Sequence, residues 1–277
     1  MARGDGDRVV RCARGHLHWG RFGAAGLLPV HQGHILLQQR AWWTPGGNLW
    51  ALFGGARDSH EDGIAAALRE TGEESTLDTG LVRPFGVIRD DHGKWAYDTV
   101  IGTIDTMPAV HPANAETRAA AWIPVDEVTS MALYEPFAKT WPTLRAALSQ
   151  PVVVIDVANV MGSRPDGWWK DRLGAATRLR DELAAVVAAG VPGIAPFDLA
   201  FPEALFVVEG AARGIDSVPG VTVVDAPGSG DDTIVQMAKG RLDVPCLVVT
   251  ADRELRQRCE KAGAQVKGPR WLLDQLP

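Results

Sequence analysis

The chain has few cysteines, no long apolar run and no excess of basic residues. Only Cys12, Cys246 and Cys259 occur among its 277 residues, and they show neither disulfide spacing nor paired metal-ligand spacing. This usage suits a reducing compartment, so we expect a cytoplasmic protein. The first residues contain no apolar stretch of signal-peptide length. No run of about eighteen apolar residues occurs, so we expect no membrane span.

The charge balance excludes a strongly basic nucleic-acid-binding module. The net charge is −6, from 28 basic and 34 acidic residues. Residues 1–150 contain 14 basic and 17 acidic residues, and residues 151–277 contain the same numbers. Nonspecific binding to nucleic acid depends on basic patches, which neither part provides in excess. The hydrophobic fraction of 46% is that of an ordinary globular protein, and the length suits two domains.

The most informative segment is GARDSHEDGIAAALRETGEE, which begins at Gly55. We predict a helix from Asp62 to about Glu74. On that helix Glu70, Glu73 and Glu74 are spaced i, i+3 and i+4, so they share one face. Like charges at this spacing repel each other, and a divalent cation such as Mg²⁺, which prefers oxygen ligands, offsets the repulsion. The alternative is an acidic helix face exposed to solvent.

The full spacing resembles the Nudix box, G-x5-E-x7-R-E-U-x-E-E-x-G-U, in which U is aliphatic. Seven positions fall in register: Gly55, Glu61, Arg69, Glu70, Glu73, Glu74 and Leu77. Three positions depart from the pattern. Thr71 stands where an aliphatic residue is usual, Thr76 replaces the glycine, and Phe53 replaces the proline that often precedes the glycine pair. The segment AWIPVDEV also resembles the end of many Nudix domains, so the resemblance covers roughly residues 20–148.

This resemblance implies an α/β/α sandwich with a mixed sheet. It also implies hydrolysis of a nucleoside diphosphate linked to another moiety, with a nucleotide or another diphosphate compound as substrate. The implied cofactor is Mg²⁺ or Mn²⁺, and the implied metal ligands are Glu61, Glu70, Glu73 and Glu74. Arg69 is counted with the catalytic residues, although we expect it to fix the loop by pairing with Glu61 or Glu70 rather than to bind phosphate.

The catalytic base and the substrate contacts are less well defined. Glu70 is either a metal ligand or the base that orients the attacking water, and Glu116 is a candidate base outside the box. Gly54, Gly55 and Arg40 are expected to bind the substrate, because glycine lets a ligand approach the backbone and a helix start offers N–H groups to phosphate oxygens. The alternatives are an ordinary turn for the glycine pair and a solvated loop carboxylate for Glu116.

The pattern changes at Pro151, where the apolar run VVVID begins a series of strands alternating with helices. We predict strands near residues 152–156, 204–208, 221–224 and 246–250, and helices near residues 171–189, 231–240 and 252–263. This alternation indicates a parallel sheet with helices on both faces. Residues 1–20 and the segment GVPGIAPFDLAFPE are predicted to be irregular. We therefore predict an N-terminal domain over residues 1–150 and a C-terminal α/β domain over residues 151–277.

Acidic residues follow the predicted strands of the second domain: Asp156, Asp231, Asp232, Asp252 and Glu254. Ligands of open α/β sheets gather at the carboxyl ends of strands, so these residues are candidate ligands for one or two Mg²⁺ ions. Their order, with Asn159 three residues after Asp156, resembles the NYN family of PIN-like nucleases, although Val157 replaces the usual glycine. The resemblance covers about residues 151–272 and implies a ribonuclease with RNA as partner. The alternative for Asp231 and for Asp252 is a helix N-cap, and Asn159 is alternatively a turn residue.

Two alternatives stay open for the whole chain. In the first, the Nudix part is a non-catalytic nucleotide sensor that regulates a C-terminal nuclease, although a sensor need not retain Glu70, Glu73 and Glu74. In the second, the chain is mainly a nuclease and the Nudix part serves its regulation. No motif in the sequence indicates which diphosphate is the substrate or whether the chain forms oligomers.

Overall fold

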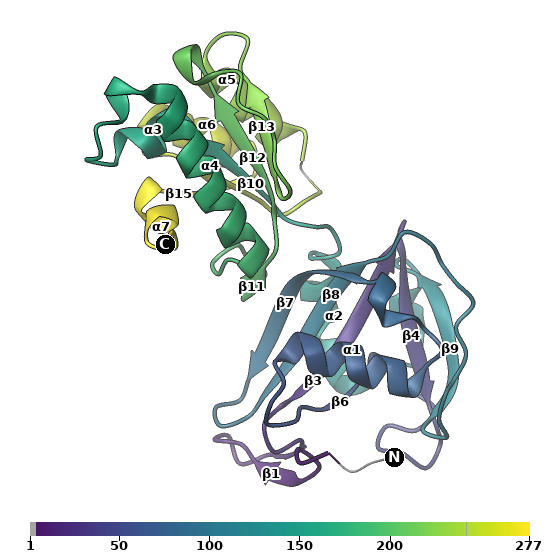
Figure 1. Cartoon of the computed structure of the whole chain (residues 1–277). Coiled ribbons are helices and arrows are strands. Elements are labelled where there is room, and N and C mark those ends of the chain that lie inside the picture. Colours follow the sequence, from purple (N-terminus) through teal and green to yellow (C-terminus); the bar gives the residue numbers. More distant parts are fainter. Residues whose placement is uncertain (1–3, 242) are drawn as a thin grey trace. The chain divides into compact units, whose positions relative to one another are not determined.

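The computed structural model describes residues 4–241 and 243–277, which form two compact units. The first unit ends at Leu148 and the second begins at Ser149, whereas we placed the boundary after Gln150. Each unit has its own sheet and its own helices (Figure 1). In the described part of the chain, no helix is both long and apolar enough to cross a membrane.

The first unit is built on a mixed sheet. Its central strand β3 pairs in parallel with β8 and antiparallel with β4 and β6, and β9 continues the sheet beside β4. All but the last residue of β3 are buried, so this strand forms the centre of the core. The strands are β1 (Val9–Arg11), β2 (Leu17–Trp19), β3 (Ala24–His31), β4 (His34–Arg40), β5 (Trp50–Ala51), β6 (Phe53–Ala56), β7 (Arg83–Asp91), β8 (Ala96–Thr103) and β9 (Thr117–Pro124).

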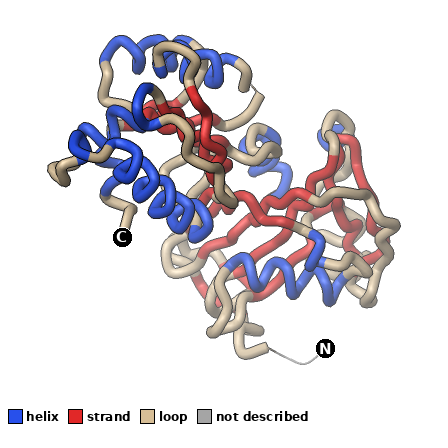
Figure 2. Tube along the Cα trace, turned by 45° about the horizontal axis from the view of Figure 1, so that its top comes forward, coloured by secondary structure: helices blue, strands red, loops and turns tan. Residues whose placement is uncertain are grey.

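Helix α1 (Gly63–Glu74) carries the acidic segment and packs on β3 and β6. Asp62 caps it by accepting a hydrogen bond from the amide of Ala65 at 2.8 Å. Ala66 and Ala67 are buried against the sheet, and so is Glu74 at the end of the helix, whereas Glu73 is exposed. The remaining helices of this unit are α2 (Glu135–Arg145) and the 3-10 helices η1 (Thr79–Leu81) and η2 (Val128–Ser130). The prediction of a mixed α/β unit with this helix is confirmed (Figure 2).

The prediction of an irregular start was wrong for the described residues, which exclude residues 1–3. Strands β1 and β2 form an antiparallel hairpin in which Val9 pairs with Trp19. Gly15 lies in its turn with a φ of 86°, a conformation that favours glycine. The segment GVPGIAPFDLAFPE also contains one short element, β11 (Leu199–Ala200). Strands of two or three residues leave too little alternation in a sequence to be recognised.

The second unit contains a five-stranded parallel sheet in the order β13-β12-β10-β14-β15. Its strands are β10 (Val152–Asp156), β12 (Glu203–Val208), β13 (Val221–Asp225), β14 (Cys246–Val249) and β15 (Gln265–Lys267). The predicted parallel sheet is therefore confirmed. The strand order reverses between β10 and β14, and ligands of such sheets bind beyond the carboxyl ends of the strands at this reversal.

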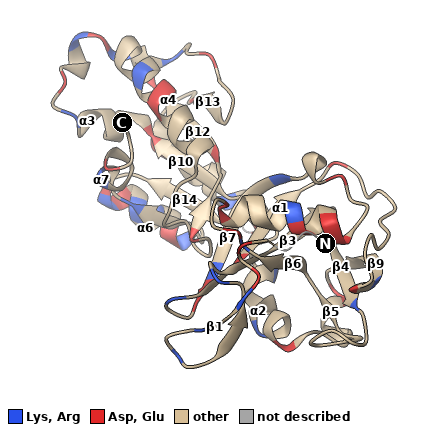
Figure 3. Ribbon diagram, turned by 60° about the horizontal axis from the view of Figure 1, so that its bottom comes forward, with Lys and Arg blue, Asp and Glu red and all other residues tan. Residues whose placement is uncertain are grey.

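Helices cover both faces of this sheet. Helices α5 and α6 pack together over an apolar core that includes Val154, Ile234 and Leu255, while α3 and α4 contact β12. Both α4 and α6 carry basic and acidic residues (Figure 3). The helices are α3 (Val157–Gly162), α4 (Arg172–Ala189), α5 (Gly230–Lys239), α6 (Arg253–Lys261), α7 (Pro269–Leu273), η3 (Trp168–Lys170) and η4 (Gly210–Ala212).

Candidate functional site

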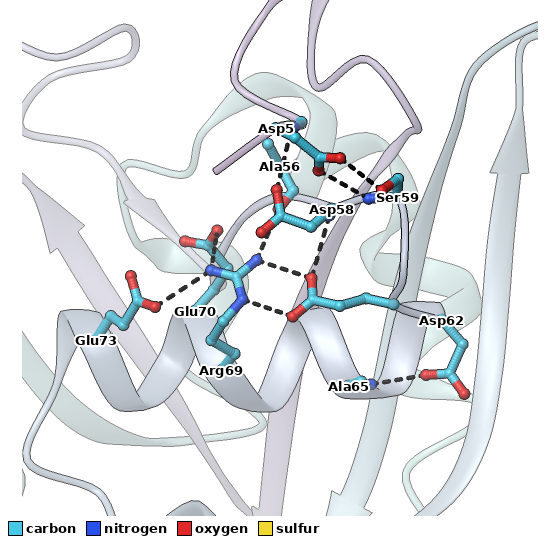
Figure 4. Close-up of polar contacts among 11 residues, drawn as sticks. Asp5, Ala56, Asp58, Ser59, Asp62, Ala65, Arg69, Glu70 and Glu73 are labelled. Carbon is cyan, nitrogen blue, oxygen red and sulfur yellow. Dashed lines mark hydrogen bonds and ion pairs between the residues drawn. The ribbon is translucent and has the colours of Figure 1, made fainter. Parts of the chain in front are cut away.

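Arg69 is the centre of the polar network on α1 (Figure 4). Its Nε and Nη2 donate to the two carboxylate oxygens of Glu61 at 2.7 and 3.0 Å. Its Nη1 donates to Glu70 at 2.9 Å and to Glu73 at 3.3 Å, and its Nη2 also reaches the carbonyl oxygen of Ala56 at 3.0 Å. The rigid guanidinium group donates to three carboxylates at once, and this holds the three carboxylates in one arrangement. These contacts favour a positioning role for Arg69.

Glu61 belongs to the loop that precedes α1. Its side chain is 8% exposed, and besides Arg69 it accepts a hydrogen bond from the amide of Asp58 at 3.1 Å. These bonds hold its pKa below the usual range, the hydrogen bonds from Arg69 being the largest cause. Because both oxygens are already engaged, its contacts favour fixing the loop. Direct metal ligation by Glu61 stays a prediction.

Glu74, the last residue of α1, is buried and faces the sheet. Its Oε2 accepts hydrogen bonds from Nε2 of Gln38 and from the amide of Gly54, both at 3.0 Å. Burial raises its pKa to about 7, and the charges of Glu70 and Glu116 act in the same direction against the hydrogen bond from Gly54. Glu74 is therefore a carboxyl whose neutral form is favoured by its buried surroundings.

Glu70 and Glu73 lie at different depths on the same helix. The side chain of Glu70 is 17% exposed, and burial raises its pKa against the opposing effect of Arg69. The side chain of Glu73 is 47% exposed and has Arg69 as an ion-pair partner. The helix therefore presents one buried, one half-buried and one exposed carboxylate in adjacent turns.

The glycine pair is explained by close neighbours, which are the carboxylate of Glu70 at Gly55 and the backbone of β3 at Gly54. Gly54 and Gly55 lie on β6 beside the C-terminal half of α1. A Cβ on Gly55 would lie 2.4 Å from Oε2 of Glu70, and a Cβ on Gly54 would lie 2.2 Å from the carbonyl oxygen of Ala25. Gly54 therefore has no room for a side chain, whereas a side chain at Gly55 would displace the carboxylate of Glu70. Substrate binding by Gly54 and Gly55 stays a prediction.

Two of the departures from the Nudix pattern have local explanations. Thr71 is fully buried, and its hydroxyl donates to the carbonyl oxygen of Ala67 at 2.7 Å, so it fills a core position with its polar atom satisfied. Thr76 lies after the helix end, where its backbone amide donates to the carbonyl oxygen of His111 and its hydroxyl oxygen accepts from the amide of His111. The chain leaves the helix through Ser75 in an extended conformation, so no left-handed residue is needed there.

Gly72 is a weak point of α1. It is exposed, and a Cβ there would have ordinary contacts with Thr79 at 3.8 Å or more. We expect Gly72→Ala to raise the free energy of unfolding by about 0.5–1 kcal/mol, because glycine is less favourable than alanine inside a helix. Urea denaturation of the two proteins measures this. An unchanged or lower midpoint would contradict the packing described here.

Arg40 and Glu116 flank the acidic face from the sheet. Arg40 ends β4, donates through Nε to the carbonyl oxygen of Pro45 at 2.8 Å and lies over the ring of Tyr134. Glu116 is half-buried immediately before β9, and its charge contributes to the raised pKa of Glu74. Both residues therefore act electrostatically on the carboxylate cluster. Their roles in substrate binding and in base catalysis stay predictions.

The second unit has a cavity of about 460 Å³ at the strand reversal. Four carboxylates line it, and each follows or ends a different strand or begins a helix: Asp156, Glu209, Asp231 and Asp252. Asn159 lines it as well and accepts a hydrogen bond from the amide of Ala251 at 2.9 Å. The structure thus brings together three of the predicted acidic residues.

The other two predicted residues do not line this cavity. Asp232 is exposed and forms an ion pair with Arg258, and Glu254 lies on the exposed first turn of α6. Glu209, which lines the cavity, was missed, although its place directly after the predicted strand 204–208 was a usable signal. Metal binding by any of these residues stays a prediction.

Asp252 has the N-cap role that we considered for it, whereas Asp231 does not, because Ser229 caps α5. Asp156 is also a helix N-cap, which we had not considered. Asp156 caps α3 by accepting from the amide of Asn159 at 3.1 Å, and its other oxygen accepts from the hydroxyl of Thr250 at 2.8 Å. Asp252 caps α6 through the amide of Leu255. Burial raises the pKa of Asp156, and burial together with the charge of Asp252 raises the pKa of Asp231. The N-cap hydrogen bonds hold the carboxylates of Asp156 and Asp252 at the cavity, and they do not cancel the negative charge there.

Comparison with known proteins finds relatives of the first unit. The family model of the NUDIX domain matches residues 20–144. A protein of Mycobacterium tuberculosis named "Putative 8-oxo-dGTP diphosphatase 3" is 39% identical over 162 residues, which are 53% of this chain and 72% of that protein. A "Nucleoside triphosphate pyrophosphatase/Nudix hydrolase fusion protein" of Bifidobacterium longum is 34% identical over 154 residues, 52% of this chain. The chain spans about a third of that protein's length, 32%.

Among solved structures, the Nudix hydrolase RenU from M. Smegmatis is 34% identical to this chain. The match spans 50% of this chain and 93% of the RenU chain, with a TM-score of 0.46. The family assignment depends on the family model and on the mycobacterial relative. The match ends at residue 144, within the first unit. Through that unit, with its acidic helix α1, the chain belongs to the Nudix hydrolase family.

Proposed function

We propose that the first unit hydrolyses the diphosphate bond of a nucleoside diphosphate linked to another moiety, with Mg²⁺ or Mn²⁺ as cofactor. The observation that carries this proposal is the acidic face of α1, on which Arg69 holds Glu70 and Glu73 beside the buried Glu74. A nucleotide sensor that does not catalyse hydrolysis does not need three potential metal-binding carboxylates on one helix face. The alternative of a non-catalytic sensor is therefore the weaker one.

The donor set fits a hard divalent cation. The predicted ligands Glu61, Glu70, Glu73 and Glu74 supply oxygen atoms, which Mg²⁺ prefers. Burial raises the pKa of Glu74, and a cation bound beside it would favour its charged form. When bound, the cation neutralises phosphate oxygens and lowers the pKa of water.

Glu70 is our choice for the residue that accepts the proton of the attacking water. Burial beside Gly55 raises its pKa, which suits a group that takes up a proton and releases it again. Arg69 keeps its carboxylate in place through the bond at 2.9 Å. Glu116 is the second choice, and the pH profiles of Glu70→Gln and Glu116→Gln distinguish the two.

The name of the mycobacterial relative suggests the first substrates to test. We propose purine nucleoside triphosphates, 8-oxo-dGTP among them, as the substrate class. The experiment measures release of the nucleoside monophosphate, separated by chromatography, from a panel containing 8-oxo-dGTP, dGTP, ADP-ribose and a dinucleoside polyphosphate, with Mg²⁺ and with EDTA. Release that depends on Mg²⁺ supports the proposal. Tight binding of a nucleotide without any turnover supports the sensor instead.

For the second unit we propose divalent-metal-dependent cleavage of phosphodiester bonds in RNA. The cavity at the strand reversal supports this proposal, because it gathers Asp156, Glu209, Asp231 and Asp252 around one space. The test is cleavage of a single-stranded RNA by the full chain with Mn²⁺, compared with the Asp156→Asn variant. Equal cleavage by both proteins would rule out this cavity as the nuclease site.

Metal binding at this cavity is predicted to depend on Asp231. We expect Asp231→Asn to weaken Mn²⁺ binding by at least about tenfold, since it removes a carboxylate from the cavity. The measurement is calorimetric titration in a chain that also carries Glu73→Gln, which weakens the first site. Asp232→Asn is the matched control, because Asp232 pairs with Arg258 and does not line the cavity. An equal loss of Mn²⁺ affinity in Asp231→Asn and in Asp232→Asn would contradict the prediction.

The two sites are predicted to work independently. We expect a fragment of residues 1–149 to fold and to retain diphosphate hydrolysis, since the first unit has its own sheet and core. In the full chain, Asp156→Asn is expected to leave that hydrolysis unchanged. Rates of both proteins with the best substrate of the panel provide the measurement. An inactive fragment together with slower hydrolysis by Asp156→Asn would show that the units act as one.

A further inference from the structure

One cysteine and three histidines meet at the start of the first unit, apart from the acidic face of α1. Cys12, His16 and His18 belong to the β1–β2 hairpin, and His92 lies between β7 and β8. We call this group the Cys/His cluster. One ligand atom from each residue, the sulfur or a ring nitrogen, lies within 4.8 Å of all the others.

The spacing of these atoms is near that of a tetrahedral site. With metal–sulfur and metal–nitrogen bonds of about 2.3 and 2.0 Å, neighbouring ligand atoms in a tetrahedron are about 3.5 Å apart. Small rotations of the side chains about their own bonds close the remaining gap. Cys12 is buried, His18 and His92 are half-buried, and only His16 is exposed, so an ion enters from the side of His16.

Two buried nitrogen atoms in the cluster have no hydrogen-bond partner of good geometry, although the thiol of Cys12 interacts with the imidazole of His92. They are Nε2 of His18 and Nδ1 of His92. Buried polar atoms without partners are rare and require a cause. A metal ion between these imidazoles would satisfy both atoms at once.

The surroundings hold the imidazoles in a binding orientation. The other nitrogen of His92, Nε2, lies 3.0 Å from Oδ2 of Asp90. A carboxylate on the far nitrogen of a histidine is the usual support for a metal-binding imidazole. His18 is stacked on the ring of Trp95, with centroids 3.9 Å apart.

The backbone also fixes the loops that carry the cluster. The amide of Cys12 donates to the carbonyl oxygen of His16 at 3.0 Å, and the amide of Ala13 donates to the carbonyl oxygen of Gly93 at 2.9 Å. The second bond joins the hairpin directly to the loop of His92. The cluster is therefore formed by two segments that are already held together without an ion.

We propose that Cys12, His16, His18 and His92 bind one Zn²⁺ ion with tetrahedral coordination. A thiolate and three imidazoles select zinc over Mg²⁺, which requires oxygen ligands. Four protein ligands close the coordination sphere, so the site is structural rather than catalytic. Its role is to fasten the hairpin to the β7–β8 loop. The hairpin follows the segment in which Asp5 and Gly6 bind Ser59 and Asp58, next to the loop of Glu61 (Figure 4).

The test is metal analysis of the full chain. After removal of metal with a chelator and return of Zn²⁺ in the presence of excess Mg²⁺, we expect one zinc ion per chain. Replacement by Co²⁺ is expected to give the intense visible bands of a tetrahedral ion and a sulfur-to-cobalt charge-transfer band. These spectra are read on the wild-type protein, so they decide the question even if a variant does not fold. A chain that keeps no zinc and gives only the weak bands of octahedral cobalt overturns the proposal.

Variants assign the ligands. Cys12→Ser is expected to lose the charge-transfer band and to bind zinc at least about tenfold more weakly. His92→Ala is also expected to bind zinc at least about tenfold more weakly. Loss of a residue that only supports a ligand already costs about tenfold or more in metal affinity. Matched controls are Cys259→Ala, a buried cysteine of the second unit, and His111→Asn, an exposed histidine. Both controls are expected to keep one zinc ion and the cobalt spectrum. A charge-transfer band that survives Cys12→Ser and disappears in Cys259→Ala overturns the assignment.

Discussion

The Glu73→Gln variant is expected to hydrolyse the substrate at least about a hundredfold more slowly than the wild-type chain, while it remains folded. Glutamine keeps the shape of the side chain but removes the charge that would hold the cation. Loss of a supporting residue at a metal site already costs about 10–100-fold in activity, so loss of a ligand should cost no less. Because Glu73 is exposed and its partner Arg69 keeps two other carboxylates, folding is not expected to suffer.

The measurement is kcat with saturating Mg²⁺, together with the Mg²⁺ concentration that gives half of the maximal rate. Glu127→Gln is the matched control, since Glu127 is exposed and its side chain makes no capping bond. The control is expected to have the wild-type rate. A wild-type rate in Glu73→Gln would remove Glu73 from the metal site.

The largest effect on stability is expected from Glu74. Its carboxyl has a pKa of about 7 in the folded metal-free chain, against an ordinary value of 4.5. Between these values the folded state holds a proton that the unfolded state has released. The free energy of unfolding therefore falls as the pH rises from about 4.5 to about 7, by roughly 2–3 kcal/mol from this residue. The glutamine side chain of Glu74→Gln does not ionise, so the contribution of this position to the free energy of unfolding is expected not to change with pH.

Urea denaturation in EDTA at a series of pH values measures this difference. The stability of Glu74→Gln relative to the wild type is expected to increase with pH up to about pH 7 and then to stay constant. Saturating Mg²⁺ is expected to remove most of the difference, because the ion favours the charged carboxylate. A difference that does not vary with pH would show that Glu74 ionises in the folded chain as it does in the unfolded one.

The sequence predicted the elements that have long, regular patterns. The run VVVID became the buried strand β10, and the acidic segment became α1 with Asp62 as its cap. The acidic face could be located because helical periodicity alone places Glu70, Glu73 and Glu74 together. The different depths of these residues could not be predicted, because they depend on where β6 and the side chain of Gln38 lie in space.

Residues whose function depends on distant partners were missed. Gln38 holds Glu74 across 36 positions of sequence and is itself held by the hydroxyl of Thr117. His92 joins the hairpin histidines only because β7 and β8 turn beside the start of the chain. Nothing in the local sequence around either residue distinguishes it from an ordinary strand or loop residue. Glu209 differs, since its place at a strand end was a signal that could have been used.

The guanidinium group of Arg69 has a consequence for how the acidic site is assembled. It acts as an internal counter-ion that keeps Glu61, Glu70 and Glu73 from repelling each other before any cation arrives. Helix α1 can therefore form on a newly made chain without waiting for magnesium. Under the proposed hydrolysis, the supply of the cation would govern when this site becomes active, whereas the formation of α1 would not depend on it.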